Sequence, residues 1–135
     1  MSAIVVGYVP KAEGRAALRH AAKEAKLRGA KLVVVNSAHM GRGVEPEDVV
    51  QSAEELDAAR RELDEAGVEA EVRQLTRGQD VADDLIAVAT ETAADLIVIG
   101  LRRRSPLGRL ILGSNAQRVL LDAPCAVLAV KAEES

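Results

Sequence analysis

Residues 3–37 read AIVVGYVPKAEGRAALRHAAKEAKLRGAKLVVVNS, a stretch that predicts a strand, a helix and a second strand. The runs 3–8 and 31–37 are almost continuously apolar and rich in β-branched residues, which is typical of strands covered on both faces. Between them, apolar residues recur at helical spacing, at Ala17, Leu18, Ala21, Ala22 and Ala25. Gly29 follows where a helix C-cap belongs. The stretch therefore predicts a β-α-β unit with parallel strands.

The same alternation continues to the end of the chain. Further apolar runs predict strands at 68–75, 95–100 and 125–130, and helical patterns predict helices at 45–67, 79–94 and 114–123. Run 68–75 alternates apolar and polar residues, as an edge strand does. Right-handed crossovers turn this order into an α/β fold, an open five-stranded parallel sheet with helices on both faces. We expect a single Rossmann-like domain over residues 1–135.

Composition argues against several classes of partner. The net charge is −3, Phe and Trp are absent, and Tyr8 is the only aromatic residue. Nucleic-acid binders usually carry a basic excess, and single-strand binders stack bases on aromatic rings. No apolar run approaches the ~20 residues that cross a bilayer. The start of the chain has no signal-peptide layout, so we expect a cytoplasmic protein with no nucleic-acid or membrane partner.

The segment GLRRRSPLGRLILGSNAQRVL, residues 100–120, leaves the predicted fourth strand. Open α/β sheets bind ligands beyond the carboxyl ends of the strands, where the strand order reverses. Gly100 would let a ligand approach the backbone there. Gly113 and Ser114 open the last helix, so their N–H groups, the hydroxyl and the positive helix end suit a phosphate. The alternative is that Ser114 only caps the helix.

Basic side chains crowd the same segment in an otherwise acidic chain. They are Arg102, Arg103, Arg104 and Arg109. Guanidinium groups match the geometry of phosphate oxygens, which favours an anion site. A solvated loop is the alternative interpretation.

Two phosphate-binding motifs are approached but not matched. In GRGVEP, residues 41–46, Pro46 replaces the third glycine of a dinucleotide fingerprint, which close helix packing requires. In GRLILGSN, residues 108–115, Ser114 stands where a P-loop has its lysine. Neither a dinucleotide enzyme nor a Walker-type NTPase is predicted.

Gly100, Gly113 and Ser114, together with IVVGY at 4–8 and ADLIVIG at 94–100, carry a family resemblance. The chain resembles the universal stress protein family, whose nucleotide-binding members have Gly-x-x-Gly followed by Gly-Ser or Gly-Thr. The resemblance implies strand order 3-2-1-4-5 and binding of ATP or AMP, with Mg²⁺ as a candidate companion of the nucleotide. That strand order leaves the last strand, Cys125–Val130, at an edge with neither charge nor proline in the run, so we expect a homodimer that pairs this strand with its copy. The candidate nucleotide-binding residues are Gly7, Tyr8, Val9, Val35, Asn36, Gly100, Arg102, Arg103, Gly113, Ser114 and Asn115.

Two residues depart from the family pattern. Val9 stands where nucleotide-binding relatives usually have an aspartate that contacts the sugar or base, so one polar contact is lost. Backbone groups near Val35 and Asn36 remain available to adenine. Arg103 replaces the second glycine of the motif, where its side chain could block the phosphates by bulk or add a charged clamp.

The other candidates for chemistry have simpler explanations. His20 and His39 lack further ligands at zinc spacing. Asp83 and Asp84 are expected on a solvated helix face, and Cys125 is expected to be a buried structural thiol. Without a recognisable general base, we predict no catalytic residues and at most slow ATP hydrolysis. The sequence favours a regulatory stress-response protein that binds adenine nucleotide; the alternative is a nucleotide-free protein acting through protein contacts.

Overall fold

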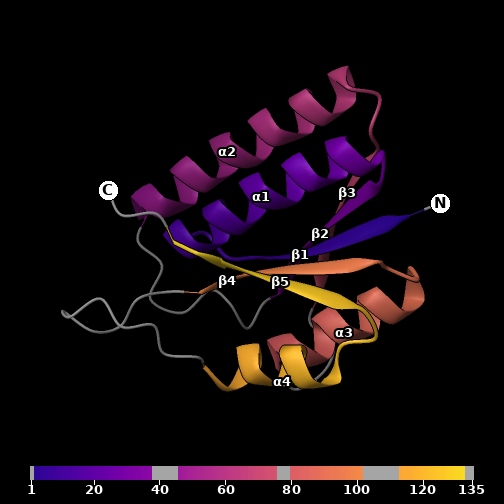
Figure 1. Ribbon diagram of the computed structural model, residues 1–135. Helices are drawn as coiled ribbons and strands as arrows, with labels where there is room; N and C mark the ends of the chain where they lie inside the picture. Colours follow the sequence, from indigo (N-terminus) through magenta and orange to yellow (C-terminus); the bar gives the residue numbers. More distant parts are fainter. Residues whose placement is uncertain (1, 38–45, 76–79, 102–112, 133–135) are drawn as a thin grey trace.

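The computed structural model describes residues 2–37, 46–75, 80–101 and 113–132. Strands and helices alternate along these residues: β1 (Ala3–Tyr8), α1 (Ala12–Arg28), β2 (Lys31–Ser37), α2 (Pro46–Glu65), β3 (Ala70–Leu75), α3 (Val81–Glu91), β4 (Leu96–Leu101), α4 (Ser114–Asp122) and β5 (Ala126–Lys131). Helices α1 and α2 cover one face of the sheet, and α3 and α4 cover the other (Figure 1). None of the helices in the described residues is long and apolar enough to span a membrane.

The sheet is parallel throughout, with strand order β3-β2-β1-β4-β5. This confirms the predicted α/β fold and strand order. β1 pairs with β2 on one side and with β4 on the other, so the strand order reverses between β1 and β4. The carboxyl ends of these two strands therefore form the edge at which α/β proteins bind ligands.

Strand β3 begins two residues later than the sequence predicts. Gly67 has a φ of 74°, a left-handed conformation that ends α2. The N–H of Val68 then donates to the carbonyl oxygen of Leu63 at 2.8 Å, which closes the helix end. Because that N–H belongs to the cap, Val68 cannot join the strand ladder.

The two faces of the sheet carry separate cores. Ile4 and Val6 of β1 pack with Leu18 of α1 on the α1–α2 face. Val5 packs with Leu85 of α3 on the opposite face. Side chains alternate between the faces of a strand, so a strand covered on both faces must be apolar at every position. This explains the continuous apolar runs in the sequence.

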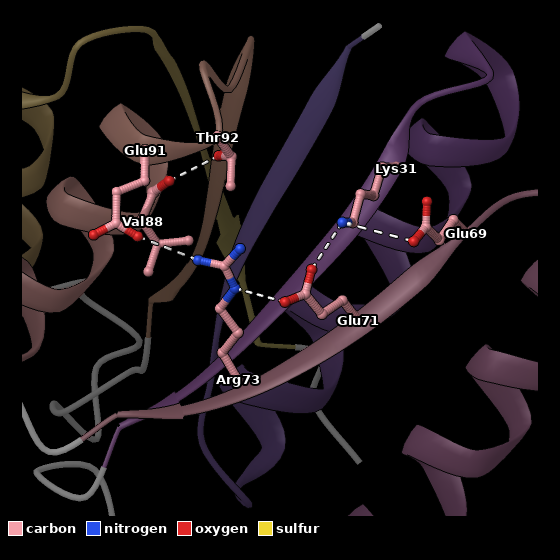
Figure 2. Close-up of polar contacts among 7 residues, drawn as sticks. All are labelled: Lys31, Glu69, Glu71, Arg73, Val88, Glu91 and Thr92. Atoms are coloured by element: carbon pink, nitrogen blue, oxygen red, sulfur yellow. Dashed lines mark hydrogen bonds and ion pairs between the residues drawn. The ribbon is translucent and has the colours of Figure 1, made fainter.

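A charged network centred on partly buried side chains lies on the face of β3 that is turned toward α3 (Figure 2). Glu71 accepts from Arg73 Nε at 2.7 Å and pairs with Lys31 Nζ of β2 at 2.8 Å. Arg73 also reaches Glu91 of α3, and Lys31 reaches Glu69. The hydrogen bond from Arg73, followed by that from Lys31, lowers the pKa of Glu71, and the bond to Glu71 raises the pKa of Lys31. The polar half of the alternating run is therefore an ion-pair network at the edge of the sheet.

Glu71→Gln should lower the free energy of unfolding by about 0.5–1 kcal/mol at pH 7, because partly exposed ion pairs contribute little. A carboxyl whose pKa is lower in the folded state stabilises the fold above its unfolded pKa, and this contribution disappears as pH falls through the folded value. Urea unfolding should therefore show the parent and Glu71→Gln converging as the pH falls below about 4.5, the ordinary pKa of a glutamate carboxyl. The exposed α2 substitution Glu65→Gln is the control. A difference that stayed constant over this range would contradict the assignment.

Candidate functional site

A small cavity of about 100 Å³ lies at the carboxyl ends of β1 and β4. Its walls include Gly7 near the end of β1, Val9 just after that strand, Gly100 near the end of β4, and Asn115 at the start of α4. These are four of the predicted site residues, and they come from three segments of the chain, near residues 8, 100 and 115. The structure brings them together because the ends of parallel neighbouring strands meet at one edge of the sheet.

Two glycines let the first turn of α1 pack directly on the strand ends. A Cβ on Gly14 would lie 2.7 Å from the carbonyl carbon of Val9 and closer still to its oxygen. A Cβ on Gly100 would lie 2.6 Å from the carbonyl carbon of Glu13. Gly100 was expected to admit a ligand, and the structure places the backbone of Glu13 against it. Sequence reasoning missed Gly14, although a glycine in an alanine-rich helix costs about 1 kcal/mol and signals a packing requirement.

Helix α4 begins beside this cavity. Gly113 is its N-cap, with φ −72° and ψ 166°, and makes no side-chain capping bond. The N–H of Gln117 donates to the carbonyl oxygen of Gly113 at 3.0 Å, which closes the first turn. Ser114 is therefore the first helical residue, and the interpretation of Ser114 as only a cap is wrong. The first N–H groups of a helix have no partner within it, so they can receive an anion.

Two side chains of α4, Asn115 and Arg118, contact the start of α3. The N–H of Ala82 donates to Asn115 Oδ1 at 3.3 Å. Arg118 Nη1 lies 3.2 Å from both carboxylate oxygens of Asp80, the N-cap of α3, and the guanidinium also pairs with Asp83. Asn115, predicted as a ligand contact, thus also joins the two helices.

The side chain of Tyr8 lies on the other face of the sheet. It is only 4% exposed, packs in the α1–α2 core, and its hydroxyl donates to the carbonyl oxygen of Ser52 at 2.8 Å. Burial raises the pKa of Tyr8. Val35 of β2 is fully buried in the core on the α3–α4 face. Its neighbour Asn36 is half-buried and pairs with Tyr8 in the sheet. Only the backbone of Tyr8 is thus available beside the strand ends.

Asp84, Cys125 and the candidate metal ligands complete the set of predicted side chains. Asp84 is 1% exposed, which corrects the expectation of a solvated face: its position on α3 turns toward the sheet. Cys125 is half-buried against the α3–α4 core, and burial raises the pKa of its thiol. The described residues contain no group of three His, Cys, Asp or Glu side chains that could hold a metal. Arg102, Arg103, Arg104, Arg109 and His39 lie outside the described residues.

The universal stress protein family model matches residues 1–131. The chain belongs to the universal stress protein family. It is 43% identical to a universal stress protein of Mycolicibacterium smegmatis, over 95% of this chain and 96% of that protein. A universal stress protein structure from Archaeoglobus fulgidus is 38% identical with a TM-score of 0.71, covering 97% and 98% of the two chains. A second structure from that organism, in complex with dAMP, is 33% identical with a TM-score of 0.67 and the same coverage.

Proposed function

We propose that this universal stress protein is a regulatory homodimer of the cytoplasm that binds an adenine nucleotide, ATP or AMP. The observation that carries the proposal is the start of α4, with its glycine N-cap and exposed first residue, beside a cavity at the reversal of strand order. The similarity to a structure in complex with dAMP supports the same ligand class.

Each part of the nucleotide has a matching place in this proposal. The N–H groups of Ser114 and Asn115, with Gly113 beside them, face the phosphates, and Arg102 and Arg103 add charge. The backbone groups of Val35 and Asn36 would hydrogen-bond to the adenine. Gly7, Tyr8 and Val9 lie beside the sugar, where Val9 lines the cavity with an apolar side chain and offers no side-chain hydrogen bond. Any Mg²⁺ would be bound mainly through the phosphates, because the described residues hold no metal cluster.

Strand β5 supplies the proposed dimer interface. Leu128 is 36% exposed, and Ala126 and Ala129 are exposed as well, while Val130 is buried in the core. An uncovered edge strand with neither charge nor proline in residues 125–130 is a template for pairing. Two-fold antiparallel pairing of β5 with its copy would cover both edges at once.

The proposed nucleotide can be detected directly. Denaturing the purified protein should release adenine nucleotide that chromatography identifies, and calorimetry should measure binding of ATP and AMP. Bound nucleotide would serve as a signal or a structural cofactor, with at most slow hydrolysis. Absence of both release and binding would favour the nucleotide-free alternative, in which the protein acts through protein contacts.

Gly113→Val should weaken ATP binding at least 100-fold, because an isopropyl group would stand over the N–H groups that receive the phosphates. The fold should persist, since no atom of the described residues lies within 4 Å of a Cβ at Gly113 and its φ of −72° suits valine. Calorimetry measures the affinity, and circular dichroism checks the fold. Gln117→Val, one turn further along α4, is the matched control. Equal affinities of Gly113→Val and the parent would place the phosphates elsewhere.

A further inference from the structure

We propose that Arg118 is a positioning residue that fixes the start of α4 and thereby sets the affinity of the site for phosphate. This inference rests on the proposed nucleotide site. It assigns a role to a side chain that lies one helical turn beyond Ser114 and does not line the cavity.

The apolar packing of α4 leaves its orientation weakly specified. The helix has nine residues, of which only Val119 is buried. Leu120 and Leu121 are 42% and 83% exposed. Val119 and the half-buried Ala116 face the α3–α4 core, but both side chains are small, so their packing only weakly constrains rotation about the helix axis. Polar contacts must therefore help to determine where the first-turn N–H groups point.

Arg118, whose side chain is 43% exposed, contributes two carboxylate partners at the start of α3 to these polar contacts. Its guanidinium pairs with both oxygens of Asp80 at 3.2 Å and with Asp83. Asp80 also accepts the N–H of Asp83 at 3.0 Å, which caps α3. A planar guanidinium fork held between carboxylates fixes direction as well as distance. Arg118 therefore joins α4 to the capped start of α3, and Asn115 makes the second link one turn earlier.

Arg118 also neutralises a concentration of negative charge near the proposed phosphates. Besides Asp80 and Asp83, it lies 3.7 Å from the carboxylate of Asp122. Without the guanidinium, these three carboxylates would repel an approaching phosphate. Removing the guanidinium would misplace the first N–H groups of α4 and would leave the carboxylates unneutralised. Both changes weaken binding of the phosphates and leave the contacts to adenine and sugar intact. The expected signature is a defect that grows with the phosphate charge of the ligand.

The test compares the affinities of ATP, AMP and adenosine for the parent, Arg118→Ala, Arg118→Lys and the control Gln117→Ala. We expect Arg118→Ala to weaken AMP binding about tenfold and ATP binding more, while adenosine binding changes less than twofold. Arg118→Lys should recover part of the loss, because lysine restores the charge without the fork. Amide hydrogen exchange at residues 117–120, whose N–H groups bond within α4, should accelerate in Arg118→Ala and stay at the parent rate in Gln117→Ala once intrinsic exchange rates are corrected for.

The outcomes separate this inference from the proposed function. A parent that binds neither AMP nor ATP overturns both. A parent that binds AMP, with Arg118→Ala losing AMP and adenosine affinity equally or losing neither, overturns the role of Arg118 alone. If Arg118→Ala does not fold, Asp83→Asn removes one anchor of the same contact by a near-isosteric change. It should then reproduce the selective loss of AMP over adenosine, and an unchanged ratio of the two affinities would overturn the inference.

Discussion

Gly14→Ala should destabilise the domain by about 2–3 kcal/mol, despite the roughly 1 kcal/mol that alanine gains over glycine within a helix. The added methyl would lie 2.7 Å from the carbonyl carbon of Val9 and closer to its oxygen. Both are backbone atoms, and the Val9 carbonyl also accepts the N–H of Lys11 at 2.7 Å, so it cannot move freely. The first turn of α1 must shift away from β1. Urea unfolding at an unchanged m-value measures the loss.

Gly100→Ala should produce a loss of similar size, since its methyl would meet the backbone of Glu13. Gly113→Ala is the control for adding one methyl group, because its Cβ would have no atom within 4 Å in the part of the chain that the structure describes. It should cost less than about 1 kcal/mol, the difference between glycine and alanine at an N-cap. If Gly14→Ala proved as stable as Gly113→Ala, the close approach of α1 to β1 would be wrong.

Ala129→Pro should convert the proposed dimer into a folded monomer. The N–H of Ala132 donates to Leu101 of β4 at 3.1 Å, so by alternation the even-numbered residues of β5 turn their N–H groups toward β4. Ala129 then directs its N–H away from the sheet, where proline is tolerated on an edge strand. In a two-fold dimer the substitution removes two hydrogen bonds, leaves two carbonyls unpaired and inserts two rings. The dissociation constant of the dimer should rise at least about 100-fold.

Sedimentation at micromolar concentration distinguishes the two states, and urea unfolding checks the stability of the monomer. Ala129→Ser keeps the outward N–H and should remain dimeric. Leu128→Pro serves as the opposite control: its N–H points to β4, so it should damage the fold itself. A monomeric parent, or an Ala129→Pro protein that remains dimeric, would contradict the β5 interface.

The arrangement of elements could be predicted from the sequence because the relevant signals are local. Strands covered on both faces need uninterrupted apolar residues, and Gly29, with φ 62°, ends α1 as its position after the apolar stripe indicates. The site region was also predictable in outline. Gly7, Val9, Gly100 and Asn115 lie at or beside the ends of elements that a parallel sheet must bring to one edge, and they line one cavity.

Local patterns by themselves thus determined the five-stranded parallel fold and the edge where the site lies. Tertiary structure alone decided which way individual side chains face and which distant segments they meet. Tyr8 reaches Ser52, 44 residues away, and Arg118 reaches Asp80, 38 residues away. A single sequence does not encode such pairs locally, because they depend on how helices are seated on the sheet. The burial of Asp84 and the contact of Gly14 with Val9 emerge for the same reason: both are consequences of helix packing.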